Sequence, residues 1–117
     1  MKIEGVHHVA VEVTDLDAAL AFYSGVLGMR IRDDRPDVSP GAWLDAGRDQ
    51  VHLVLTEQPP PTGRRANTAF HVDHFDSWIS HLAAHGVAVR QLTLVPGAPR
   101  RALFCDPVGN RIELTQR

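Results

Sequence analysis

Cysteine, aromatic residues and long apolar runs are all scarce in this chain of 117 residues. Its single cysteine, Cys105, cannot form an intrachain disulfide, which excludes a disulfide-stapled scaffold and suits a reducing compartment. No apolar run approaches the roughly 20 residues that a membrane-spanning helix needs. The N-terminal stretch MKIEGVHH also lacks the apolar core of a signal peptide. We therefore expect a cytoplasmic protein.

Neither sign of charge is in excess. Lys and Arg number 12 and Asp and Glu number 14, so the formal net charge is -2 and no basic surface for nucleic acid is expected. A hydrophobic content of 44% and a charged content of 22% are ordinary for a globular domain, and the length suits a single one. Composition therefore predicts neither a nucleic-acid partner nor a membrane partner, and it leaves the chemistry open.

Hydrophobic periodicity predicts two helices and several short strands. One helix covers 15–28, with Asp15 as its N-cap and Gly28 as its end, and another covers about 75–85. The predicted strands are 6–13, 29–33, 42–46, 51–56, 68–72, 87–94, 102–105 and 111–115. Between the two halves, the segment 57–66 contains three consecutive prolines and a glycine, which is typical of a linker.

The second half repeats the first. Val13 aligns with Val72 at an offset of 59, and QVHL at 50–53 aligns with RIEL at 111–114 at an offset of 61. The pattern predicts an α+β fold of two βαβββ modules, about 1–56 and 67–117, related by a pseudo-twofold. Because one copy cannot cover its own sheet, we expect both to form a single domain, 1–117, with a curved mixed sheet and the helices on its convex side.

Strand alternation separates the adjacent histidines His7 and His8, because neighbouring strand residues point to opposite faces. The Val row of 6–13 is the face that a helix would cover, which places His8 on the open face and His7 beside the helix. The same test places four more polar residues on open faces: His52, Asn67, His71 and Glu113. The repeat relates position 8 to 67 and position 52 to 113, so two symmetry-related pairs converge if the sheet curls.

The arrangement resembles the vicinal oxygen chelate superfamily, which includes glyoxalase I, fosfomycin-resistance transferases, methylmalonyl-CoA epimerase, extradiol dioxygenases and bleomycin-resistance proteins. The resemblance covers nearly the whole chain and depends on HHVAVEVTDLDAALAFYSGVLGMR near the start and DPVGNRIEL near the end, the second being the sharper motif. In metal-binding members, the ligands come from the first and last strands of each module, on the concave face. Carried over by position, the resemblance implies ligand positions at His8, His52, Asn67 and Glu113.

Two imidazoles and a carboxylate suit a divalent transition metal such as Zn, Ni, Fe, Mn or Co, and they leave positions open for a substrate that chelates through two neighbouring oxygens. The predicted ligands are therefore His8, His52 and Glu113. Glyoxalase I and the epimerase usually carry Glu or Gln at the place of His52 and His at the place of Asn67, whereas extradiol dioxygenases take their ligands at the places of His8, Asn67 and Glu113. An amide is a weak ligand for such metals, so Asn67 is expected to orient the substrate instead.

Catalytic roles are predicted for Glu113, also a ligand, and for His71, and substrate-binding roles for Asn67, Trp43 and Arg101. Structural alternatives stay open for several of them. Glu113 can instead pair with Arg111 or Arg101, and Trp43 can simply pack. Cys105 is expected to pack rather than to act as a nucleophile, because no base is placed for it.

Two functions from different classes follow. The first is a metal-dependent enzyme acting on a small oxygen-chelating substrate, as an isomerase, lyase or oxygenase. The second is a metal-free protein that sequesters a ligand, as bleomycin-resistance proteins do. The enzyme is favoured for two reasons. The aromatic content is only 6%, which is low for a ligand-sequestering groove, and three of the four positions at which the family places its ligands carry residues that can bind a metal. The resemblance also implies a homodimer.

Overall fold

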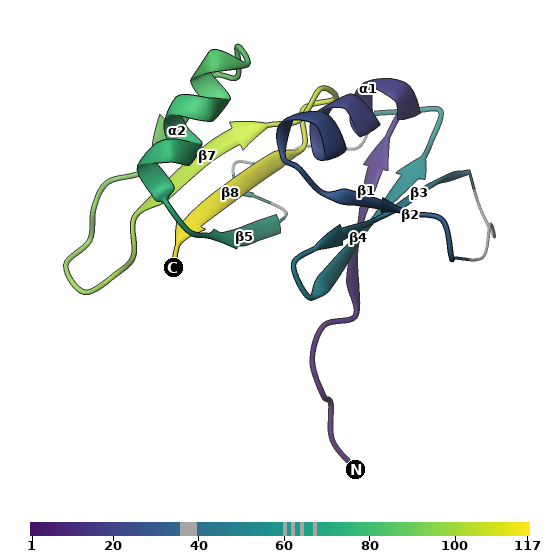
Figure 1. Ribbon diagram of the computed structural model, residues 1–117, viewed down its shortest axis with the longest axis horizontal. Helices are drawn as coiled ribbons and strands as arrows, with labels where there is room; N and C mark the ends of the chain where they lie inside the picture. Colours follow the sequence, from purple (N-terminus) through teal and green to yellow (C-terminus); the bar gives the residue numbers. More distant parts are fainter. Residues whose placement is uncertain (36–39, 60, 62, 64, 67) are drawn as a thin grey trace. The chain divides into compact units, whose positions relative to one another are not determined.

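The computed structural model describes residues 1–35, 40–59, 61, 63, 65, 66 and 68–117 (Figure 1). The chain divides into two compact units, Met1–Pro60 and Pro61–Arg117. The boundary lies within the proline-containing segment predicted as the linker, and each unit contains one copy of the predicted repeat. No helix among the described residues is long and apolar enough to cross a membrane.

Unit 1 contains one four-stranded mixed sheet. Its elements are β1 (His8–Val13), α1 (Leu16–Leu20), η1 (Ala21–Val26), β2 (Arg30–Arg32), β3 (Gly41–Ala46) and β4 (Asp49–Leu55). The strand order is β1-β4-β3-β2, with β1 parallel to β4 and the other neighbours antiparallel. The first and last strands of the unit are therefore adjacent, and their polar side chains lie side by side.

The helical stretch of unit 1 begins where the sequence predicts. The Asp15 carboxylate accepts a hydrogen bond from the backbone N–H of Ala18 at 3.0 Å, as an N-cap does. The prediction of one regular helix is wrong, however, because the stretch widens into a π-helix over Ala21–Val26. The wider turn directs both Phe22 and Tyr23 into the core, where their rings meet edge to face at 5.3 Å.

Alternate residues of the sheet in unit 1 form its core, as the pattern predicts. The most deeply buried strand residues are Val13, Leu44, Val51 and Leu53, each exposed by 2% or less. Each such side chain contributes about 1.5 to 3 kcal/mol when it is fully buried. The residues between them face the other way, and this open face carries the histidines.

Unit 2 repeats this topology. Its elements are β5 (Thr68–Val72), α2 (Phe75–Ala84), β6 (Arg90–Gln91), β7 (Arg101–Cys105) and β8 (Arg111–Gln116). The strand order is β5-β8-β7-β6 with β5 parallel to β8, which is the order of unit 1 under the repeat. The duplicated α+β fold is thereby confirmed. The strand predicted over 87–94 is only two residues long, because the chain leaves the sheet toward a loop that contains Pro96 and Pro99.

The DPVGN motif forms the turn between β7 and β8. The buried Asp106 carboxylate accepts hydrogen bonds from the backbone N–H of Val108 at 3.1 Å and of Asn110 at 2.8 Å, and from the Asn110 side chain at 2.8 Å. Gly109 adopts a φ of 99°, a conformation that other residues rarely adopt. The motif is therefore a structural device that sets the start of β8, the strand that carries Glu113.

Candidate functional site

Three aromatic side chains meet on the open face of unit 1. Cross-strand pairing places Trp43 of β3 and Ala10 of β1 on either side of His52. The Trp43 and His52 rings stack with centroids 4.0 Å apart and planes 8° apart, and the His8 ring lies 4.7 Å from Trp43 and 6.1 Å from His52. His8 is exposed, whereas Trp43 and His52 are half-buried. The structure thus brings together all three sequence-predicted site residues of this unit.

His7 does not lie on the helix side of the sheet, so that prediction is wrong. The strand begins only at His8, and the alternation that separates neighbours does not extend back to the irregular segment before it. The Nδ1 atoms of His7 and His8 are 2.8 Å apart, within hydrogen-bond distance, and the His7 ring lies 6.4 Å from Trp43. This contact occupies Nδ1 of His8 and leaves its Nε2 as the nitrogen available to a ligand.

Arg35 belongs to the same cluster and was missed by the sequence prediction. Its guanidinium lies 4.4 Å from the centroid of the Trp43 ring, a cation–π contact. Two buried polar atoms near this cluster have no hydrogen-bond partner among the described residues. They are Nε of Arg35 and Oε1 of Gln50, the residue of β4 that pairs with His8. Buried polar atoms are normally satisfied, so these two indicate where a polar ligand would be received.

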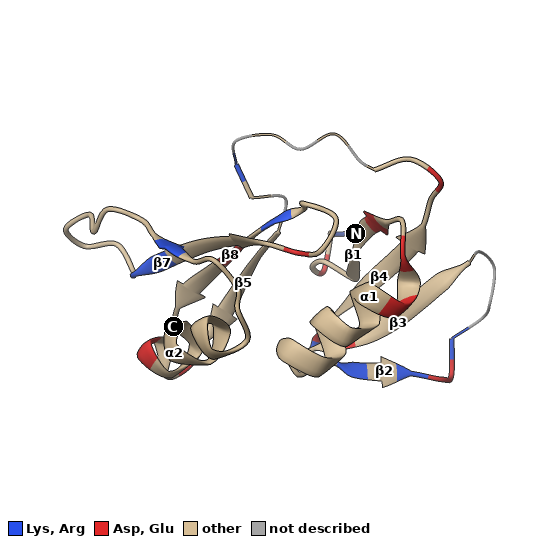
Figure 2. Cartoon of the chain, turned by 90° about the horizontal axis from the view of Figure 1, so that it is seen from above, with Lys and Arg blue, Asp and Glu red and all other residues tan. Residues whose placement is uncertain are grey.

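The charged residues near Arg35 could have indicated its role in the sequence. Asp45 accepts hydrogen bonds from Arg30 at 3.0 Å and from Arg32 at 2.9 Å, and Arg32 also binds both oxygens of Asp34. The Arg32 and Arg30 side chains lower the pKa of Asp45, and Arg32 lowers that of Asp34. Figure 2 shows these opposite charges gathered at β2. Because these four side chains neutralise one another, Arg35 is the cation of this region that, among the described residues, contacts an aromatic ring.

His52 is held in its neutral form. Burial is the main cause of a lowered pKa, and the neighbouring His8 and Arg35 lower the pKa of His52 further because a second positive charge beside them is unfavourable. Neutral imidazole is the form that binds a metal or accepts a proton. The lowered pKa therefore favours the form of His52 that can act as a metal ligand.

The open face of unit 2 carries the remaining described site residues. Register places Glu113 of β8 between Ala69 of β5 and Leu103 of β7. Glu113 accepts a hydrogen bond from the Thr115 hydroxyl at 2.8 Å and lies 3.7 Å from the Arg101 guanidinium. Arg101 and Glu113 are thus brought together, and the alternative pairing that the sequence left open is present as a long contact.

Three further residues complete the comparison with the sequence predictions for this unit. His71 is exposed on β5, where it pairs in register with Thr115, on the same face as Glu113. Asn67 lies outside the described residues. Cys105 is exposed, so the expectation that it packs is wrong: it ends β7 on the open face, where no helix covers the sheet.

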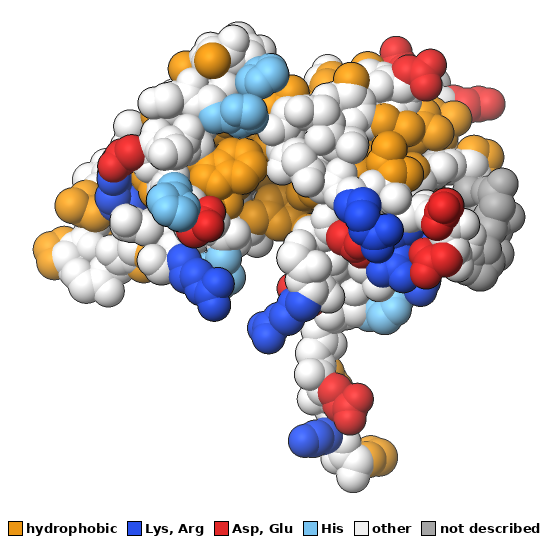
Figure 3. Space-filling view, viewed as in Figure 1, with side chains coloured by type: hydrophobic (Ala, Val, Ile, Leu, Met, Phe, Trp, Pro, Cys, Tyr) orange, Lys and Arg blue, Asp and Glu red, His pale blue; other side chains and the backbone are white. Residues whose placement is uncertain are grey.

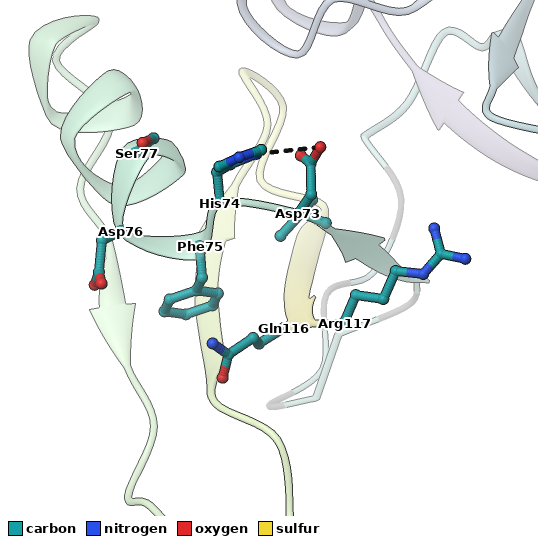
Figure 4. A pocket seen from close by; sticks show the side chains of 8 residues that line it. Asp73, His74, Phe75, Asp76, Ser77, Gln116 and Arg117 are labelled. Atoms are coloured by element: carbon teal, nitrogen blue, oxygen red, sulfur yellow. Dashed lines mark ion pairs between the residues drawn. The ribbon is translucent and has the colours of Figure 1, made fainter.

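A shallow pocket of about 350 Å³ lies at the start of α2 in unit 2. Figure 4 shows His74 and Asp73 facing each other there, with an ion-pair distance of 3.2 Å. His74 stands where Asp15 stands in unit 1, and it adopts a left-handed φ of 45° without a side-chain cap. None of the sequence-predicted site residues lines this pocket.

Comparison with known proteins decides the family. The model of the Glyoxalase/Bleomycin resistance protein/Dioxygenase superfamily matches residues 5–114. The chain belongs to this superfamily. The family that the strand pattern and the DPVGN motif resemble is thereby confirmed.

Three solved structures are similar to this chain. A glyoxalase-family protein from Bacillus anthracis is 28% identical, with a TM-score of 0.89 over 100% of this chain and 98% of that one. TnmS3, an antibiotic binding protein from Streptomyces sp. CB03234, is 32% identical, with a TM-score of 0.78 over 99% and 98% of the two chains. A mutant of the fosfomycin resistance protein FosX from Listeria monocytogenes, complexed with Mn(II) and a dihydroxypropylphosphonic acid, shares the fold at 19% identity and a TM-score of 0.84, over 98% and 93% of the chains.

The similar structures include one complexed with Mn(II) and one described as an antibiotic binding protein, so the residues present decide whether a metal fits this chain. Within either unit, the described residues contain no group of three His, Cys, Asp or Glu side chains placed to hold an ion. Unit 1 does supply two imidazoles whose ring centroids are 6.1 Å apart. Metal–nitrogen bonds of about 2.1 Å place the centres of two imidazoles on one ion roughly 5 to 6 Å apart. The histidine pair therefore fits a shared metal.

Proposed function

We propose that the two units form one functional domain and that the chain is a divalent-metal-dependent enzyme of the glyoxalase or dioxygenase type. Its substrate is a small molecule that chelates through two neighbouring oxygens. The observation that supports this proposal is the pair His8 and His52, adjacent on one open face at a separation that suits one ion, with His52 held neutral. His8, His52 and Glu113 would hold the metal, whose identity among Zn, Ni, Fe, Mn and Co stays open.

The chain's own residues would divide the work as follows. The bound ion supplies Lewis acidity toward a substrate oxygen. Trp43 offers an aromatic wall, and Arg35, whose Nε lacks a partner among the described residues, receives an anionic oxygen of the substrate. Arg101 neutralises part of the Glu113 charge, and Asn67 orients the substrate. Glu113 or His71 accepts the proton that leaves the carbon beside a carbonyl, in the isomerase form of the proposal.

The second function is a metal-free ligand-binding protein. Two observations favour it: the 32% identity to the antibiotic-binding TnmS3, and the cluster of aromatic rings of Trp43, His52 and His8 on the open face, which could contact a ligand without a metal. The two proposals differ in what the histidines do. In the enzyme they hold an ion, whereas in the binding protein they shape a wall.

The deciding experiment is metal analysis of the untagged protein, followed by calorimetric titration of the metal-stripped protein with Ni, Zn, Mn and Fe(II). The enzyme proposal expects one tight equivalent that is lost in H8Q, in H52Q and in E113Q. The exposed Glu57 supplies the matched control, because E57Q removes the same charge outside the open face. The same number of tightly bound equivalents in H8Q as in the wild type, or no uptake at all, would refute the enzyme and leave the ligand-binding function.

We also propose that the protein works as a homodimer in the cytoplasm, as the resemblance and the single cysteine suggest. Sedimentation at micromolar concentration is expected to give twice the mass of one chain. A monomer throughout that range would refute the dimer without touching the metal site.

A further inference from the structure

A second pair of histidines lies on the outer surface of α2, far along the chain from the open-face residues of unit 1. His81 and His85 are four residues apart, so they lie one above the other on one side of the helix. Their ring centroids are 4.6 Å apart, the rings are tilted by 59°, and both residues are exposed. Figure 3 shows histidine side chains at the surface of the part of the molecule that contains α2.

The end of the helix favours a cation beside these rings. His81 lies in the last turn and His85 is the C-cap, and the His85 N–H already donates to the carbonyl of His81 at 3.1 Å. The carbonyl groups of a helix C-terminus carry partial negative charge, which stabilises a nearby cation. The residues beside the pair on the helix end, Ala83, Ala84 and Gly86, add neither charge nor bulk.

The spacing is the one that zinc-binding helices use, with two histidines at i and i+4 on one face. In the hydrolytic version of that motif, a glutamate follows the first histidine and serves as the general base. Here Leu82 takes that place and is fully buried in the core of unit 2. The pair therefore has the ligands of such a helix without its base, which fits binding without hydrolysis.

We propose that His81 and His85 form a bidentate surface site for a divalent ion of the copper, nickel and zinc class, separate from the open-face site. A centroid separation of 4.6 Å needs only a small outward rotation of two exposed rings to reach the roughly 5 to 6 Å of a shared ion. Imidazole pairs bind Cu(II) more tightly than Ni(II) or Zn(II). The remaining coordination positions are open to water or to an outside ligand.

Trp78 supplies a reporter for this site. Its ring lies edge-on to His81 at a centroid distance of 5.6 Å, and the chain has only one other tryptophan, Trp43. In the variant W43F, all tryptophan emission comes from Trp78. Paramagnetic Cu(II) bound at His81 and His85 would quench it.

The experiment titrates Cu(II) into full-length W43F and into the same chain with H81Q and H85Q added. Because the second imidazole binds intramolecularly, pairing raises affinity well above that of one histidine. W43F is expected to show saturable quenching, and the triple variant a midpoint at least about tenfold higher. A matched control, A83H with H85A, keeps the number of histidines but spaces them by two residues, on different sides of the helix. It is expected to bind as weakly as the triple variant.

Equal midpoints in all three proteins would overturn the proposal, as would tight binding by the spacing control. A second measurement covers the case in which W43F fails to fold. In equilibrium dialysis against Cu(II), the variant with H81Q and H85Q is expected to bind one equivalent fewer than the wild-type chain. The equivalent that it keeps is the one that H8Q removes. Loss of both equivalents in either variant, or no change in H81Q with H85Q, would refute a separate site.

Discussion

Replacing Asp106 tests how the motif between β7 and β8 stabilises unit 2. Its carboxylate accepts three hydrogen bonds and is almost completely buried, with the residue exposed by 5% and Asn110 by 2%. In D106A, the two backbone N–H groups and the Asn110 amide lose their acceptor together. The change removes no core packing, so its cost reports on the polar contacts of this carboxylate, these hydrogen bonds among them.

The magnitude follows from the bond count. Hydrogen bonds to a charged group are worth about 1.5 to 3 kcal/mol each, and water admitted to the turn recovers part of the loss. We therefore expect D106A to lower the free energy of unfolding by about 3 to 5 kcal/mol. D106N is the control: its amide oxygen still accepts from both backbone groups, and Asn110 can turn its own amide to accept from the new NH₂. Only the charge is lost, at a cost of about 1 to 2 kcal/mol.

The assay is urea unfolding followed by circular dichroism, with the slope of the transition compared between variants. D106A is expected to unfold at lower urea with an unchanged slope, and D106N to lie between it and the wild type. A D106A within about 0.5 kcal/mol of the wild type, or a D106N as damaged as D106A, would refute the reasoning.

Three further outcomes are expected. G41A should severely destabilise unit 1 in the same urea assay, because a Cβ at this position overlaps the Leu53 carbonyl oxygen across the sheet; normal stability would contradict the β3–β4 register. In an NMR titration, His52 should lose its proton at a lower pH than histidine in an unstructured peptide. Below about pH 6.5 the unfolded chain therefore binds more protons at His52 than the folded chain does. The contribution of His52 to the free energy of unfolding is full above about pH 6.5 and declines below it. A pH-independent difference in stability between H52Q and the wild type would contradict this. R35Q should weaken binding of an oxyanion such as inorganic phosphate while leaving a neutral diol unaffected, as isothermal titration would show.

Much of the fold could be predicted because its signals are local. Asp15 caps a helix through its own side chain, and Asp106 with Asn110 builds a turn within five residues. The strand β5, Thr68–Val72, has the predicted bounds, because its alternation of side chains is also a local signal. Such features depend on residues close together in the chain.

The errors share a cause in tertiary contacts. The widened helix over Ala21–Val26 depends on where Phe22 and Tyr23 find space in the core. His7 lies beside His8 because the first strand begins at His8, two residues later than the predicted start at residue 6. The role of Arg35 depends on tertiary contacts, because Arg30 and Arg32 both pair with Asp45 while Arg35 contacts Trp43.

The parallel pairing of the first and last strands of each unit has a consequence for biosynthesis. β1 leaves the ribosome first but has no hydrogen-bonding partner until β4 follows, whereas β3 and β4 can pair as a local hairpin. At about 5 to 20 residues per second, the backbone of β1 would wait roughly two to eight seconds before β4 is available to pair with it. The same delay recurs for β5 and β8. Each nascent unit thus passes through a window in which an apolar strand is exposed to chaperones, and slower translation lengthens that window twice in one chain.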